Sequence, residues 1–149
     1  MEVFRLLRPG DINLELGVAD KECEMNYYLF HLKALNTFME EGVQYAKKSF
    51  NLDPYKVVKT KFLPLAKILD DYLPADVQQI DFLTVDVEGA DELVLHSNNW
   101  VKYRPQVICL ERHMNYDEFK DTSLCKFLES LNYQFAAKSG PSYFYYLMS

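Results

Sequence analysis

Glycine is scarce in this sequence, and its placement excludes one common way of holding a cofactor. The chain has five glycines, and no two of them are spaced as GxG. It therefore lacks the glycine-rich turn between a strand and a helix that cradles a nucleotide or nucleoside cofactor. A GxSxG elbow, a Walker loop, an HExxH helix and a recognisable Cys/His pair are also missing, which leaves the commonest hydrolase and nucleotidase signatures unmatched.

Cysteine is sparse as well. The three cysteines, Cys23, Cys109 and Cys125, are odd in number and contain no CxxC spacing. This pattern favours reduced thiols in a cytoplasmic compartment over a disulfide framework or a zinc site. No run of about 18 apolar residues occurs, and the N-terminus has no signal-peptide core. We therefore expect a soluble, cytoplasmic protein without a structural metal.

Positive charge is not concentrated anywhere in the chain. The formal net charge is −6 and the isoelectric point is near 5.0. Without a basic patch, nucleic acid and anionic membranes are poor partners, and a neutral or cationic small ligand is favoured. The 149 residues, 49% of them hydrophobic, are enough for one folded domain, which we expect to span residues 1–149.

The most informative stretch is QIDFLTVDVEGADE, residues 79–92. An apolar run over residues 80–87 predicts a buried parallel strand, and the acid-started segment after Gly89 predicts a helix over residues 90–98. Asp86 and Glu88 fall at the carboxyl end of the strand, where such sheets bind ligands. Because strand side chains alternate, the two carboxylates can face one crevice.

A second apolar strand, PQVICLE at residues 105–111, also ends in polar side chains, Glu111 and His113. A crossover from the first strand would bring Asp86, Glu88, Glu111 and His113 to one acidic rim. Such a rim could orient a sulfonium or ammonium cation, hold a divalent metal or accept a hydroxyl proton. The alternative is structural: these acids could simply accept hydrogen bonds from backbone groups of the turn.

Other segments complete an α/β pattern. Alternation predicts a strand over residues 11–20, and a second strand over residues 24–30 could form a hairpin with it. β-Branched residues with interspersed lysines predict a strand at an edge or with an exposed face over residues 55–63. Residues 34–50 could be a surface helix or a mobile flap. Tyrosines of the last strand are expected to be half-buried. Further predicted elements are the end of a helix at 3–7, a helix after Pro64, a helix at 123–131 capped by Asp121 or Thr122, and an antiparallel hairpin of 133–137 with 142–148.

The segment IDFLTVDVEGADELVLHSNNW, followed by RPQVICLE, resembles the hallmark region of FkbM-family methyltransferases. Their pattern is roughly IDxLKIDVEGxExxVLxG, then a short gap and RPxxIxxE. Upstream, DINLELGVADKECEMNYYLF and ALNTFMEE are similar to other segments of that family in the same order. The resemblance covers most of residues 11–111. It implies a Rossmann-like class I methyltransferase sheet, with a mostly parallel core and a C-terminal antiparallel hairpin.

The resemblance also implies a cofactor and a reaction. The family uses S-adenosylmethionine, and its characterised members mostly methylate hydroxyls of natural products or glycans. Carried over by position, Asp86, Glu88 and Glu111 match the catalytic rim, which His113 could join as proton acceptor. The turn Val18-Ala19-Asp20 matches the region near the adenine, so that Val18, Ala19, Asp20 and Asp86 are the expected cofactor contacts.

The family's first strand and its Asp-x-Gly-Ala-Asn turn have no counterpart in the sequence, so we expect an N-terminally truncated sheet and an incomplete enzyme. The strands at 11–18 and 80–87 would then pair directly, or an exposed strand edge would recruit a second copy of the chain. The alternative function is a non-catalytic methyltransferase-like module used for protein interaction. A metal-dependent hydrolytic site at the rim is a weaker alternative, because no tight ligand spacing supports it.

Overall fold

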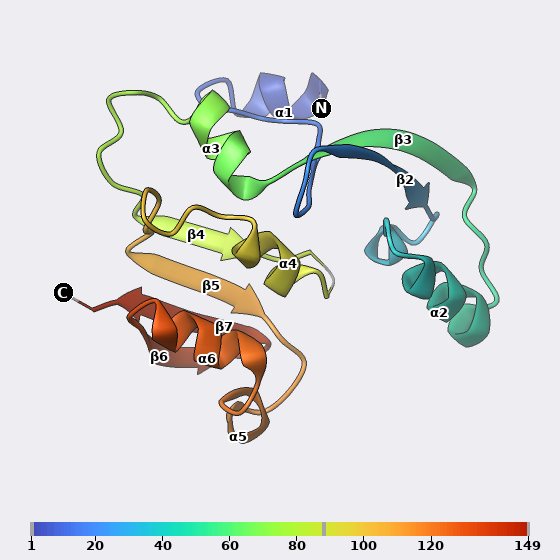
Figure 1. Ribbon diagram of the computed structural model, residues 1–149. Helices are drawn as coiled ribbons and strands as arrows, with labels where there is room; N and C mark the ends of the chain where they lie inside the picture. The colour runs from blue at the N-terminus through green and yellow to red at the C-terminus, as the bar shows by residue number, and fades with distance from the viewer. Residues whose placement is uncertain (1, 88, 149) are drawn as a thin grey trace. The chain divides into compact units, whose positions relative to one another are not determined.

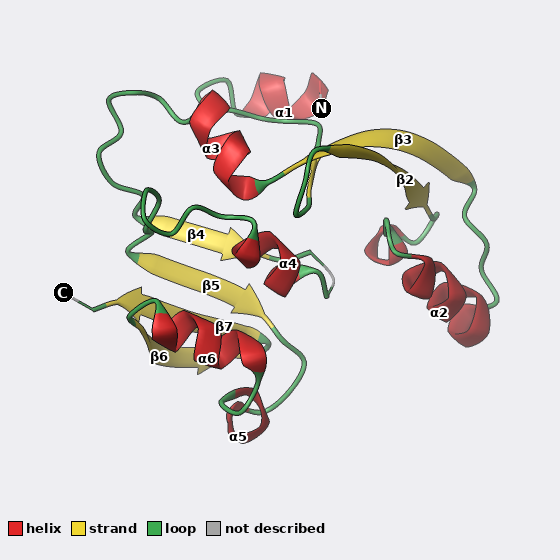
Figure 2. Ribbon diagram, in the orientation of Figure 1, coloured by secondary structure: helices red, strands yellow, loops and turns green. Residues whose placement is uncertain are grey.

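The computed structural model describes residues 2–87 and 89–148. These residues form two compact units, one ending at Pro64 and the other beginning at Leu65. Each unit has its own sheet, shown as yellow arrows in Figure 2. The two units are described in turn.

The first unit is a three-stranded sheet with order β1-β3-β2, in which β1 runs parallel and β2 antiparallel to β3. The predicted hairpin of its first two strands is wrong, because β3 lies between them. The edge position expected for β3 is wrong, because Phe62 pairs with Gly17 of β1 and with Cys23 of β2; the exposed face given as the alternative is confirmed along most of the strand. The elements are α1 (Glu2–Leu7), β1 (Gly17–Val18), β2 (Cys23–Leu29), a 3-10 turn η1 (Lys33–Leu35), α2 (Glu40–Phe50) and β3 (Lys56–Leu63).

The strand predicted over residues 11–20 shrinks to two residues. Its alternating apolar positions do not find a buried face, since Ile12 is 54% exposed. The side-chain amide of Asn13 donates to the carbonyl oxygens of Arg8 and Asp11, which holds this segment in a loop. Pairing begins only at Gly17, where a side chain would collide with the Phe62 ring: an added Cβ would lie 2.1 Å from it. Glycine is therefore required where β1 pairs with Phe62 of β3.

Residues 34–50 confirm the surface-helix interpretation over the flap. The helix α2 ends at Phe50, and Asn51 follows as its C-cap with a left-handed backbone (φ 54°). The amide of Asn51 donates to the carbonyls of Ala46 and Lys47. Tyr28 on β2 donates from its hydroxyl to the Glu40 carboxylate at 2.6 Å. This bond joins the start of the helix to the sheet.

The second unit contains a four-stranded sheet of order β4-β5-β7-β6 (Figure 1). Only β4 and β5 run parallel, since β7 returns antiparallel beside β5 and β6 pairs with β7. The mostly parallel core predicted from the sequence is therefore wrong: both sheets are small and mixed. The elements are α3 (Leu65–Tyr72), β4 (Phe82–Val85), α4 (Asp91–His96), β5 (Val107–Glu111), α5 (Tyr116–Phe119), α6 (Ser123–Ser130), β6 (Tyr133–Ser139) and β7 (Ser142–Leu147).

The strand β4 pairs only with β5 among the described residues. The strand β1 belongs to the first sheet and β4 to the second, and direct pairing of these two strands stays a prediction. The ring of Phe82, the first residue of β4, is 52% exposed. Recruitment of a second copy through this edge stays a prediction.

The core of the second unit lies between its sheet and α6. Tyr143 and Tyr145 are fully buried, which corrects the prediction that they are half-buried. They alternate with outward-facing Tyr146 along β7, as strand geometry requires. Each of these two hydroxyls has a partner. The hydroxyl of Tyr143 donates to the carbonyl of Met114 at 2.7 Å, and the hydroxyl of Tyr145 lies 3.2 Å from the Cys125 sulfur. Thr122 caps α6 as predicted, accepting from the Cys125 amide.

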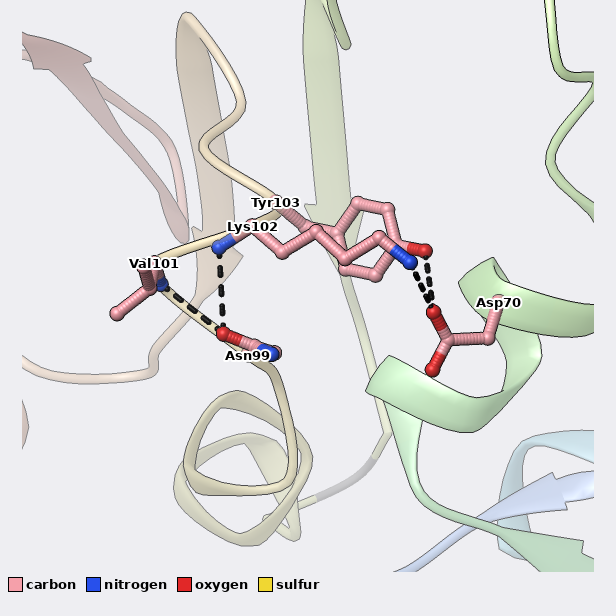
Figure 3. A network of polar contacts seen from close by, with 5 residues as sticks. All are labelled: Asp70, Asn99, Val101, Lys102 and Tyr103. Carbon is pink, nitrogen blue, oxygen red and sulfur yellow. Dashed lines mark hydrogen bonds and ion pairs between the residues drawn. The ribbon is translucent and has the colours of Figure 1, made fainter.

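A polar network fixes α3 to the loop before β5 (Figure 3). Asp70 of α3 accepts from the ammonium of Lys102 and, at 2.7 Å, from the hydroxyl of Tyr103. Asn99 orders the same loop, because its side-chain oxygen accepts from the amides of Val101 and Lys102. The ammonium of Lys102 and the hydroxyl of Tyr103 lower the pKa of the Asp70 carboxyl.

Candidate functional site

The carboxyl ends of β4 and β5 bring three segments of the second unit to one edge of its sheet. Val85 pairs with Leu110 in parallel register, so Asp86 and Glu111 follow on neighbouring strands. Glu111 also pairs with Ser142, which places the hairpin turn between β6 and β7 at this edge. The amide of Arg112 donates to the carbonyl of Pro141 at 2.8 Å and fixes the chain leaving β5 against that turn. Figure 1 shows the arrowheads of β4 and β5 pointing the same way.

The predicted rim residues occupy this edge in part. Asp86 is exposed at the end of β4. Glu111 and His113 lie close together, with 3.4 Å between carboxylate Oε1 and imidazole Nε2, and His113 is 82% exposed. The predicted role of Glu88 falls outside the described residues. The structure therefore brings Asp86, Glu111 and His113 to one sheet edge, as the sequence predicted.

A buried ion pair at the same edge was not predicted from the sequence. Asp91 lies in the first turn of α4, where an acid complements the helix dipole, yet its side chain is almost completely buried. Its Oδ2 lies 3.2 Å from Nη1 of Arg112, and its Oδ1 has no hydrogen-bond partner among the described residues. One signal was present: Asp91 occupies the position of the third acid in the pattern DVEGxE.

The electrostatics of Asp91 follow from that burial. Loss of water raises the pKa of its carboxyl above the ordinary value, while the guanidinium of Arg112 opposes the rise. The negative charge of Asp86 adds a smaller raising effect, so the two acids interact through space. Arg112, whose side chain is 19% exposed, is thus the cation that opposes the effect of burial on Asp91 behind the rim.

An open pocket of about 380 Å³ lies beside the end of β5. One side comes from the chain that leaves the strand, and the other from the hairpin turn. None of its lining residues is acidic, although the chain as a whole is. The lining residues are Arg112, His113, Met114, Lys138, Gly140 and Pro141.

The residues expected near the adenine belong to the first unit. Val18 ends β1, and the amide of Ala19 donates to the carbonyl of Leu63 at 3.1 Å, which continues the parallel pairing for one more residue. Ala19 is buried, whereas Asp20 is exposed at the carboxyl end of the strand. A carboxylate in this position can accept hydrogen bonds from ligand hydroxyl or amino groups.

No group of three or more His, Cys, Asp or Glu side chains in residues 2–87 and 89–148 is arranged to hold a metal ion. Over the same residues, none of the helices has the length and apolar character needed to cross a membrane.

Comparison with known proteins identifies the chain. The family model for the methyltransferase FkbM domain matches residues 4–135, a longer span than the segments that carry the resemblance in sequence. Comparisons with curated proteins and with solved structures gave no match. Because the family model covers most of the chain, including both compact units, the chain belongs to the FkbM methyltransferase family.

Proposed function

We propose that this protein transfers a methyl group from S-adenosylmethionine to a hydroxyl of a glycan or small molecule. The observation that carries the proposal is the match of the FkbM methyltransferase domain to residues 4–135. The edge formed by Asp86, Glu111 and His113 supports it, because ligands of α/β sheets bind at the carboxyl ends of parallel strands. A cytoplasmic location belongs to the same proposal and rests on the three unpaired thiols.

The charges at this edge fit a cationic methyl donor. S-adenosylmethionine, when bound, supplies a methyl group on a positively charged sulfur. An acceptor oxygen can bond to the methyl carbon in one in-line step as the sulfur leaves. Asp86 offers an exposed carboxylate that would attract and orient the positive charge. The predicted cofactor contact of Asp20, which lies at the end of β1 in the first unit, stays a prediction.

The acceptor hydroxyl must lose its proton as its oxygen gains the methyl group. The pair of Glu111 and His113 suits this task, since a neutral imidazole accepts a proton and a carboxylate 3.4 Å away stabilises the imidazolium that forms. The exposed ring of His113 can reach an acceptor in the neighbouring pocket, which it lines. In this proposal Glu111 is a positioning residue, and His113 accepts the proton.

Calorimetric titration with S-adenosylmethionine and S-adenosylhomocysteine tests the proposal. We expect micromolar binding that Asp86→Asn weakens about tenfold for the cationic donor and less for its neutral product, because the lost charge acts on the sulfonium. Asp76→Asn removes an exposed acid from the loop before β4 and serves as the matched control. Absence of heat from a folded sample would refute the enzyme and favour a non-catalytic interaction module.

A further inference from the structure

The open pocket beside β5 gathers nitrogen donors in a chain whose net charge is −6. Arg112 and His113 come from the segment after β5, and Lys138 comes from β6. Arginine matches the two oxygens of a carboxylate or phosphate in a fixed fork, and lysine adds a point charge. Met114 and Pro141 supply apolar surface between them. This is the composition of a site for a small anion attached to a less polar body.

Each donor is held in place by a separate contact. Arg112 is fixed by the ion pair with buried Asp91, which uses one terminal nitrogen of the guanidinium. The Lys138 ammonium donates to the carbonyl of Gly140 at 2.5 Å and lies 5.3 Å from the centre of the Tyr143 ring. Since an ammonium has three protons and a guanidinium five, both groups keep donors for a ligand. The pocket is thus partly organised before anything binds.

The local charges distinguish the roles of the donors. Asp91 offsets the charge of Arg112, and Glu111 faces His113. Within residues 2–87 and 89–148 the ammonium of Lys138 forms no ion pair with an acid, and so it supplies the excess positive charge of the pocket. Lys138 should therefore govern the affinity for an anion, and Arg112 the orientation in which the anion is held.

We propose that this pocket binds a carboxylate or phosphate group of the methyl acceptor, so that the acceptor is an acidic sugar or another anionic hydroxyl compound. That the bound anion belongs to a methyl acceptor rests on the proposed function, whereas anion binding by the pocket does not depend on it. His113 belongs to both sites, because it lines the pocket and faces Glu111. An anion held by Lys138 and Arg112 would place a neighbouring hydroxyl of the same molecule beside the imidazole.

Titrations followed by amide NMR test this pocket without requiring methyl transfer. The probes are glucuronate and inorganic phosphate, with neutral glucose as the comparison, all at constant ionic strength. We expect saturable shifts centred on the amides of Lys138, Gly140 and His113 with either anion and none with glucose. If glucuronate binds more tightly than phosphate, the carboxylate source is favoured; the reverse order favours a phosphate ester.

A matched pair of lysine variants supplies the decisive comparison. Lys138→Gln should weaken anion binding about tenfold, the effect of losing one charged hydrogen bond. Lys126→Gln, which removes an exposed lysine from α6, should leave it unchanged. Equal weakening by both variants, or no saturable shift in the folded wild-type chain, would overturn the inference. Anion binding without binding of S-adenosylmethionine would instead leave the pocket standing and refute the proposed function.

Discussion

Removal of Arg112 should expose the energetic cost of the acid behind it. In Arg112→Met the carboxylate of Asp91, only 1% exposed, keeps its charge but loses the cation 3.2 Å away. Breaking a buried ion pair from one side typically costs about 3–5 kcal/mol, and the partial exposure of Arg112 favours the lower end of that range. We therefore expect the free energy of unfolding at pH 7 to fall by about 3 kcal/mol.

A second substitution should recover part of that loss. Asp91→Asn replaces the unpaired charge by an amide of the same shape, and a neutral polar group is far less costly to bury than a charge. We expect the double variant to be more stable than Arg112→Met by about 1–2 kcal/mol. Arg104→Met provides the control background, because Arg104 donates to the carbonyl of Leu131 instead of a carboxylate. Asp91→Asn should give no recovery there.

Urea unfolding followed by tryptophan fluorescence measures these differences. The only tryptophan, Trp100, is buried in the second unit against Phe127 and Tyr133, so its emission reports on the unit that contains the ion pair. A double variant no more stable than Arg112→Met would refute the reasoning. It would show that the carboxylate of Asp91 is either solvated or already neutral at pH 7.

The same variants have a defined dependence on pH. Burial raises the pKa of Asp91 in the folded protein above the value of about 3.9 in the unfolded chain, and loss of Arg112 raises it further. Folding of Arg112→Met is therefore accompanied by proton uptake between those two values, and acidification favours the folded form. The difference in stability between wild type and Arg112→Met should shrink as the pH falls from 7 towards 4.

Three further predictions concern other parts of the chain. Leu128→Ala, in the fully buried face of α6, should lower the free energy of unfolding by about 2–5 kcal/mol in the same urea assay, and a loss below 1 kcal/mol would contradict the packing. Cys125 should react with a maleimide only after unfolding, because it is buried and burial raises the pKa of its thiol. Mass spectrometry of native and denatured samples measures the labelling, and labelling of Cys125 in the native sample would contradict the prediction. If the chain self-associates through the β4 edge, size-exclusion chromatography with light scattering should show a dimer, and Phe82→Lys should dissociate that dimer. A monodisperse monomer would exclude this self-association.

Local pattern was sufficient to predict the elements that frame the site. The strands β4 and β5 were found from their apolar runs, α4 from the acids that start it and α6 from its helical period. The predicted burial of the first strand is wrong in part, because β4 has only four residues and Phe82 is exposed. The parallel pairing of β4 with β5, and hence the meeting of Asp86 with Glu111, followed from the short helical crossover between them. The short helix α5 was missed, because four residues are too few to establish a helical period.

Sheet membership could not be predicted in the same way. Alternation over residues 11–20 looked like a strand, but nothing in that segment says whether a partner will bury its apolar positions. The position of β3 between β1 and β2 depends on chain segments distant in sequence. The ion pair of Asp91 and Arg112 was missed for the same reason: neither residue indicates by its own spacing that it will be buried against the other.

The two parts of the candidate site differ in charge, and that difference can sort two ligands. Asp86 offers negative charge at the end of β4, whereas Lys138 offers positive charge on the hairpin side of β5. Screening at physiological ionic strength acts over about 8 Å, so each ligand responds to its local charges more than to the net charge of −6. A cationic donor and an anionic acceptor would therefore be drawn to different places along one sheet edge. His113 lies on the side proposed for the anionic ligand while facing Glu111, and under this proposal its imidazole takes the proton from an acceptor held by Lys138.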